Sequence, residues 1–162
     1  MFGFEDMGKF FISLFLVLPL VTIIHQSGHL FFAKLLGCEV EIHIGTGKML
    51  CKMGPFCMRK VYFMDGWCEY KELHHRNNGK IKKTLIFLGG SIFNLTTIII
   101  VNGLILQGIL EPSILLYQFV YFSVYYVFFS LFPTQFVSGC PSDGKAVLNI
   151  LFNKPLEKDP IN

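Results

Sequence analysis

The sequence predicts an α-helical membrane protein with three transmembrane helices and a short membrane-associated β element between the first two. Hydrophobic residues make up 52% of the 162-residue chain and charged residues only 15%, a composition typical of proteins that fold in a lipid bilayer. The apolar residues also gather in long runs. We expect the whole chain, residues 1–162, to form a single membrane-embedded domain.

Three apolar runs are the predicted spans, at about residues 10–36, 85–110 and 113–133. The first contains one charged residue, Lys34, and the other two contain none. A helix rises about 1.5 Å per residue and needs roughly 20 apolar residues to cross the hydrocarbon core, so each run is long enough. A short helix is predicted beyond the third span, at residues 143–152.

The connection between the first two spans, residues 37–84, is predicted to be cytoplasmic. It holds nine Lys or Arg residues, whereas the turn between the second and third spans holds none, and basic loops remain on the cytoplasmic side. The N-terminus would then lie outside and the C-terminus inside. Because this loop also accounts for the net charge of +3, we expect a lipid bilayer among the partners and no nucleic acid.

The same connection contains the predicted β element. Residues 39–44 alternate polar and apolar side chains, which is the period of a strand. A second sheet element or a hairpin is predicted over residues 60–64 and 67–71, which flank Asp65-Gly66, a dipeptide favoured in tight turns. The histidines of this connection are expected to be exposed to solvent: His43, His74 and His75.

Two histidines in the first span predict a metal site. His25 and His29 are four residues apart, so a helix places them on one face, one turn apart, at the spacing with which two imidazoles hold one zinc ion. Polar side chains inside a span usually mark a functional interior. The alternative, on these residues alone, is a pair that only forms hydrogen bonds between helices.

A hydrolytic zinc site needs a third protein ligand and leaves a fourth position for water. Asp143 is the best candidate, because it is the only acidic residue between Pro112 and the end of the terminal helix. The irregular segment before it could fold back to membrane depth. The alternative role for Asp143 is that of a helix cap near Ser142.

The chain resembles the site-2 proteases, zinc enzymes that cut proteins within the membrane. Residues 25–37 are similar to the HExGH segment of that family. Four further segments occur in the same order as in the family: residues 45–47 (GTG), 66–67 (GW), 89–94 (GGSIFN), and 131–133 (LFP) with 142–144 (SDG). Together these segments lie within residues 20–152, and their order makes the resemblance specific.

The resemblance implies an intramembrane zinc endopeptidase that cuts a transmembrane or signal-peptide segment. It implies that His25, His29 and Asp143 bind Zn²⁺ and that Asn94 binds the substrate backbone. The strands would pair with the unwound substrate at the membrane edge. His25 would lie about 16 Å inside the cytoplasmic end of the span, so the zinc would be reached from the cytoplasm.

The catalytic position departs from the family. Its general base is a glutamate directly after the first histidine, and here that position is Gln26. A neutral amide cannot take a proton from zinc-bound water, and loss of acid–base catalysis typically costs on the order of 10² to 10⁴ in rate. We therefore expect a nearly inactive Glu-to-Gln form, natural or introduced, that still binds zinc. The alternative is a pseudoprotease that binds membrane helices without cutting them.

Two smaller departures concern substrate positioning. Ser91 stands where the family often has proline, and Ser130 stands near a position where it often has asparagine. With only three spans, the zinc would be either accessible laterally from the membrane or shielded by a second copy of the chain. A homo-oligomer is therefore a candidate assembly.

Overall fold

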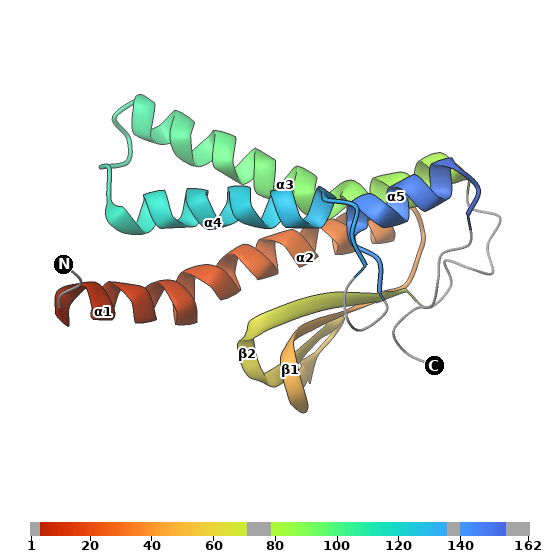
Figure 1. Cartoon of the computed structure of the whole chain (residues 1–162), viewed down its shortest axis with the longest axis horizontal. Coiled ribbons are helices and arrows are strands. Elements are labelled where there is room, and N and C mark those ends of the chain that lie inside the picture. The colour runs from red at the N-terminus through yellow and green to blue at the C-terminus, as the bar shows by residue number, and fades with distance from the viewer. Residues whose placement is uncertain (1–3, 71–78, 136–139, 155–162) are drawn as a thin grey trace.

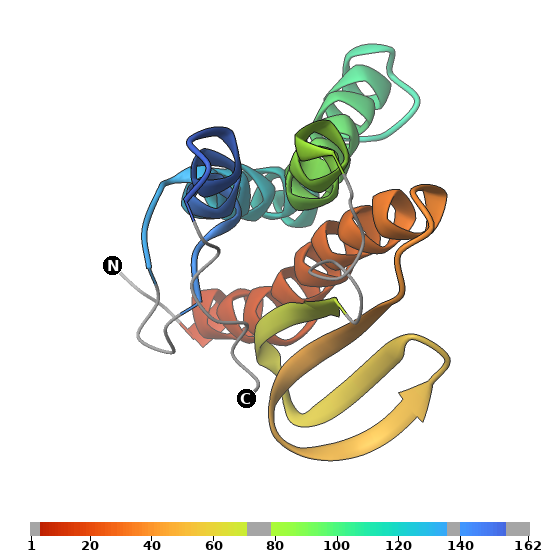
Figure 2. The same ribbon diagram turned by 90° about the vertical axis from the view of Figure 1, so that its right-hand side faces the viewer.

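The computed structural model describes residues 4–70, 79–135 and 140–154 and consists of long helices with a β ribbon on one side (Figure 1). α2 lies between this ribbon and the pair of helices α3 and α4 (Figure 2). The elements in chain order are α1 (Phe4–Ile12), the π-helical turn η1 (Ser13–Val17), α2 (Leu18–Leu35), β1 (Val40–Met53), β2 (Phe56–Tyr70), α3 (Lys80–Leu106), α4 (Ile114–Leu131) and α5 (Asp143–Leu151).

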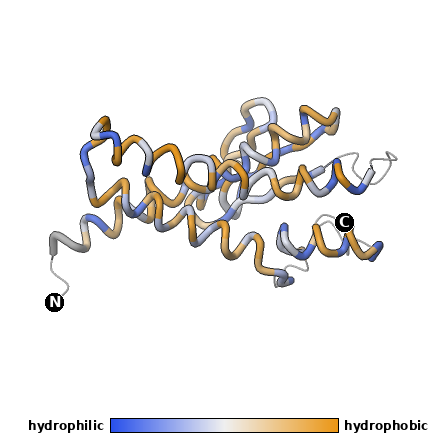
Figure 3. The backbone as a smooth tube through the Cα atoms, turned by 90° about the horizontal axis from the view of Figure 1, so that it is seen from above, coloured by the Kyte–Doolittle hydropathy of each residue, from blue (hydrophilic) through white to orange (hydrophobic). Residues whose placement is uncertain are grey.

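Three helical segments are long and apolar enough to cross a membrane, as the sequence predicted. They are Met7–Leu35, which combines most of α1 with η1 and α2, then α3 and α4. Hydrophobic residues dominate all three (Figure 3), and many of their large apolar side chains are exposed, as expected of surfaces that face lipid. α3 begins at Lys80, earlier than the predicted start at residue 85, because its first turn is polar and lies outside the apolar run that defined the span. The helix ends before Gly108, whose φ of 71° is not helical.

A polar contact ties the first half of the first span to α4. The hydroxyl of Ser13, at the start of η1, lies 2.8 Å from the carbonyl oxygen of Lys9 and 2.5 Å from Oε1 of Gln118 in α4. Polar groups at such depth need partners, since lipid offers none. Val17, Val21 and Phe119 form a small buried cluster beside this contact.

α2 and α3 cross in close contact at two glycines. A Cβ atom on Gly28 would lie 2.2 Å from the carbonyl oxygen of Gly89, and a Cβ on Gly89 would lie 2.6 Å from that of Gly28. The two backbones are therefore in direct contact, which is how small residues let membrane helices pack. The contact turns the His25 and His29 face of α2 toward α3.

β1 and β2 form one antiparallel ribbon that curls back on itself (Figure 2). His43 pairs with both Trp67 and Cys57, so the first part of β1 has β2 residues on both sides. The strand predicted over residues 39–44 is confirmed as the start of β1, which continues to Met53.

Of the two alternatives predicted around Asp65-Gly66, the second sheet element is confirmed as part of β2, and the hairpin is wrong, because β2 runs through this dipeptide without a break. The turn lies instead at Gly54-Pro55, where Gly54 has a φ of 59°. Gly66 serves close packing: a Cβ there would lie 2.7 Å from Cγ2 of Thr22 in α2. A strand glycine can mark either a turn or a close approach of another element, and here it marks the second.

The expectation that His43 is solvated is also wrong, because this side chain is only 6% exposed. Its ring stacks on Trp67 with centroids 5.0 Å apart, and its Nδ1 atom lies 3.3 Å from Nη2 of Arg59. The curl of the ribbon encloses the polar face that a flat strand would expose. His74 and His75 lie outside the described residues.

The glycine crossing yields a stability prediction. Gly28→Ala should lower the free energy of unfolding by about 1–3 kcal/mol, because the methyl group collides with backbone that cannot move aside cheaply. The measurement is denaturant or thermal unfolding of the purified chain in detergent, followed by circular dichroism. Gly103→Ala in α3 is the matched control, since a Cβ there meets nothing within 4 Å. Equal stability of the two variants would contradict the crossing.

Candidate metal centre

Two helices, α2 and α5, bring His25, His29 and Asp143 together. The Nε2 atoms of the two histidines are 3.1 Å apart, and Oδ2 of Asp143 lies 3.2 Å from the first and 3.4 Å from the second. Both histidines are only 3% exposed. Ligands bound tetrahedrally to one zinc ion at about 2.0–2.1 Å lie about 3.3–3.4 Å apart. The three atoms therefore form a triangle of nearly the size that zinc requires.

A glycine, Gly90, leaves room beside this triangle of ligand atoms because it has no side chain. A Cβ atom on Gly90, in α3, would lie 2.5 Å from Nε2 of both His25 and His29. Any other residue at position 90 would occupy the space that both imidazole nitrogens face. The glycine thus keeps clear the place where an ion bound to both nitrogens would sit.

The hydrogen bond of His29 to α3 would suit it to bind a metal ion. Its Nδ1 atom lies 2.8 Å from the carbonyl oxygen of Ile86 in α3. A carbonyl only accepts, so Nδ1 carries a proton and donates it, and Nε2 is the nitrogen that faces the cluster and that the neutral ring would offer to a metal ion. This outer hydrogen bond is the usual device that fixes the tautomer of a ligating histidine.

Asn94 is the corresponding partner of His25. Its Nδ2 atom lies 3.4 Å from Nδ1 of His25, while its Oδ1 atom is buried without a hydrogen-bond partner. A half-turn of the amide would bring Oδ1 to Nδ1, which could then donate to it and leave Nε2 free to bind metal. The orphaned oxygen therefore fits a metal-bound state. The role of Asn94 in holding substrate stays a prediction.

Asp143 is held at the start of α5 by its neighbours. Ser142, not Asp143, caps the helix, because its hydroxyl accepts from the backbone nitrogen of Lys145 at 3.2 Å. Gly144 lets α5 approach the end of α4, since a Cβ there would lie 1.9 Å from the carbonyl oxygen of Leu131. The Asp-Gly pair thus leaves the carboxylate available to the histidines.

The electrostatics of this carboxylate follow from the cluster. Burial by itself raises the pKa of Asp143, but the coulombic effect of His29 and hydrogen bonds from both histidines outweigh burial and hold the pKa below its ordinary value. Asp143 is therefore ionised at neutral pH, as a zinc ligand must be.

Gln26 follows His25 but is directed to the ribbon. Its Nε2 atom donates to the carbonyl oxygen of Gly66 at 2.7 Å, and its Oε1 atom accepts from Sγ of Cys68 at 2.8 Å. Burial raises the pKa of the Cys68 thiol, so the thiol stays protonated and can donate. Both ends of the amide are used, and a carboxylate could not donate to Gly66.

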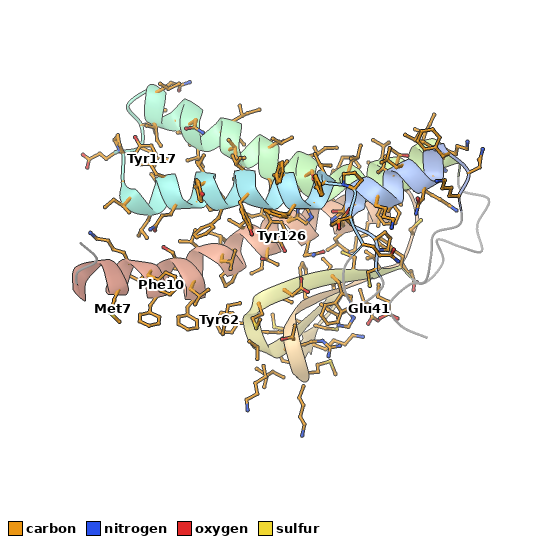
Figure 4. The ribbon with its side chains drawn as sticks, in the orientation of Figure 1. Met7, Phe10, Glu41, Tyr62, Tyr117 and Tyr126 are labelled. Atoms are coloured by element: carbon orange, nitrogen blue, oxygen red, sulfur yellow. The ribbon has the colours of Figure 1, made fainter. Side chains whose placement is uncertain are left out.

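Tyr126 is a neighbour of the site that the sequence analysis missed. It lies on the side of α4 that faces α2 (Figure 4), with its ring centroid 4.9 Å from that of His25. Nothing in the sequence distinguishes it from the other tyrosines of the third span. Its place depends on the rotation of α4, which hydropathy alone does not give.

A second group of possible ligands lies within the ribbon. Ligand atoms of Glu41, His43 and Cys57 are within 4.8 Å of one another. Lys52 already pairs with Glu41 at 2.9 Å, and Glu69 lies 3.4 Å from Nε2 of His43. Together with the Arg59 guanidinium beside His43, these groups balance their own charges, so we assign no metal here.

The fold and the site together define a helical membrane protein in which two buried histidines and a partly buried aspartate form a cluster where the spans cross. No family model matches the sequence, and no solved structure matches it. The chain is 48% identical over 151 residues to the uncharacterized membrane protein YwmF of Bacillus subtilis (strain 168), an alignment that covers 93% of this chain and 94% of that protein. The chain belongs to the same family as YwmF.

The space beside Gly90 yields a test of the cluster. Gly90→Ala should abolish zinc binding, because its methyl group would lie against both imidazole nitrogens. Zinc per chain is measured by elemental analysis of the purified protein. Gly103→Ala, on the same helix in open space, should keep the zinc content of the unchanged chain. Zinc retained in Gly90→Ala would rule out an ion in this position.

The contact between Asn94 and His25 yields a second test. Asn94→Leu should weaken zinc binding by about 10–100-fold, the usual effect of removing the outer partner of a ligand. The dissociation constant is measured by competition with a chromogenic chelator. Asn102→Leu is the control, because the amide of Asn102 bonds only within its own helix, to the carbonyl oxygen of Ile98 at 2.9 Å. Equal affinities in the two variants would exclude this role.

Proposed function

We propose that the chain holds a zinc ion between His25, His29 and Asp143, as the site-2 proteases do, and binds a membrane segment beside it without cutting it efficiently. The observation that carries the proposal is the triangle of 3.1, 3.2 and 3.4 Å between the three ligand atoms. Its edges fit tetrahedral zinc, and Gly90 puts no side chain into the space beside it.

A bound zinc ion would polarise a peptide carbonyl and acidify a water molecule. Hydrolysis also needs a protein side chain that moves the proton from the water to the leaving amine. Position 26 is where the family has that group. Gln26 has no basic atom for this role, so the proposal includes metal binding and excludes efficient hydrolysis.

The hydrogen bonds of Gln26 favour a pseudoprotease over an enzyme that has merely lost its base. Gly66 presents a carbonyl oxygen, which requires a donor opposite, and the amide supplies one at 2.7 Å. A glutamate there would place two acceptors against each other and leave a buried acceptor unsatisfied, at a cost of about 1–3 kcal/mol. The surroundings of position 26 thus suit glutamine.

The ligand we propose is a transmembrane or signal-peptide segment that unwinds near the cytoplasmic surface. The ribbon packs against α2 beside the metal cluster, and an extended segment could add to an exposed strand edge there. His25 lies ten residues before the end of α2 at Leu35, so the site would open toward the cytoplasmic side if residues 37–84 are cytoplasmic.

The first experiment measures zinc in the purified chain beside a His25→Ala, His29→Ala double variant. We expect one zinc ion per chain, lost in the double variant. Absence of zinc from the unchanged chain would overturn the proposed metal centre and leave a pair of histidines that only bridge helices.

The second experiment separates the two candidate functions. Gln26→Glu is reconstituted with a fluorogenic transmembrane peptide, and cleavage is followed by fluorescence with the unchanged chain as control. If the protein is a pseudoprotease, both the unchanged chain and Gln26→Glu should bind zinc, and neither should cleave the peptide. Gln26→Glu should also be less stable than the unchanged chain. Cleavage by Gln26→Glu alone would instead identify an endopeptidase that lacks its base.

A further inference from the structure

Two serines reach the metal cluster from outside it. Oγ of Ser130, in the last turn of α4, donates to Oδ2 of Asp143 at 2.7 Å. Oγ of Ser91, in α3, lies 3.1 Å from Oγ of Ser130. Both serines are buried, at 9% and 2% exposure. Residues from α3, α4 and α5 thus form one line of polar groups that ends on the aspartate.

The direction of these hydrogen bonds follows from counting protons. The ionised carboxylate of Asp143 only accepts, so the single hydroxyl proton of Ser130 must go to Oδ2. The oxygen of Ser130 can then only accept from its other neighbour, and Ser91 must be the donor. Each bond polarises the next, which strengthens the bond that reaches the carboxylate.

The oxygen that Ser130 holds is the one nearest the histidines. Oδ2 of Asp143 is the atom that lies 3.2 Å from His25 and 3.4 Å from His29. A carboxylate at the start of a nine-residue helix would otherwise be free to rotate, and zinc would have to fix it at the cost of its rotamer entropy. The serine fixes it beforehand.

We propose that Ser130, supported by Ser91, is a positioning residue that holds Asp143 ready as the third metal ligand. The inference rests on the zinc site proposed above. The inference assigns a role in metal binding to Ser91 and Ser130. At or near these two positions the chain departs from the site-2 protease pattern. Neither serine would contact the zinc ion, and both would act through Asp143.

The test is the zinc dissociation constant of single serine variants of the full chain in detergent, measured by chelator competition. Ser130→Ala should weaken zinc binding by about 10–100-fold, and Ser91→Ala by less, since it removes only the support of Ser130. Ser123→Ala is the matched control, because Ser123 lies on the same helix, is fully buried and has a hydroxyl without a hydrogen-bond partner. It should bind zinc as the unchanged chain does.

Two further variants distinguish positioning from general damage. Ser130→Thr keeps the hydroxyl and should recover most of the affinity. The double variant Ser91→Ala, Ser130→Ala should bind no more weakly than Ser130→Ala alone, because Ser91 acts only through Ser130. The absorption spectrum of the cobalt-loaded chain should change in Ser130→Ala, because the carboxylate ligand moves, and stay unchanged in Ser123→Ala.

The outcomes separate this inference from the function on which it rests. If the unchanged chain binds no zinc, the proposed metal centre fails and the inference fails with it. If the chain binds zinc and Ser130→Ala binds it as tightly as Ser123→Ala, only the inference is overturned. If the losses of zinc affinity in Ser91→Ala and Ser130→Ala add in the double variant, Ser91 does not act through Ser130, and the proposed support of Ser130 by Ser91 is wrong.

Discussion

The direct backbone contact between α2 and α3 is the constraint on which the site depends. In a bilayer, apolar side chains gain little by leaving lipid for each other, so close packing of small residues decides how helices associate. Gly28 and Gly89 allow an approach that any Cβ would prevent. At that separation the imidazoles of α2 reach the carbonyl oxygen of Ile86 and the amide of Asn94. The same face of α3 carries Gly90, so the contact that joins the helices also leaves room at the cluster.

The parts of the molecule that depend on local pattern could be predicted from the sequence. The three spans follow from the length of uncharged runs, and the histidine pair follows from its spacing of one helical turn. The ribbon shows where this reasoning stops. Asp65-Gly66 has the composition of a tight turn, yet the glycine is there to let Thr22 of α2 approach. His43 lies in a polar strand pattern, yet the curl of the ribbon encloses it. Both outcomes depend on what packs against the strand, which local pattern does not contain.

The hydrogen-bond partners of the proposed ligands are hard to predict from sequence for a different reason. Asn94, Ser91 and Ser130 are ordinary small polar residues of membrane helices, where most such side chains bond to their own backbone, as Thr96 and Thr97 do. Whether one faces a neighbouring helix depends on the rotation of its helix to within a fraction of a turn. Hydropathy does not fix that rotation when a span is apolar on all sides. Asn94 was singled out only through a family resemblance, and the structure adds the contact with His25.

Metal binding and proton transfer would depend on different residues in the proposed site, and these residues have different surroundings. The groups that would hold zinc are accompanied by partners for each ligand: Ile86 for His29, Asn94 for His25, and Ser130 for Asp143. The position that would move the proton carries an amide whose two ends bind β2. An amide at position 26 therefore connects the helix that bears the histidines to the ribbon that would hold an extended segment. Such a connection would fix a bound segment relative to the proposed metal, which would serve binding whether or not a bond is cut.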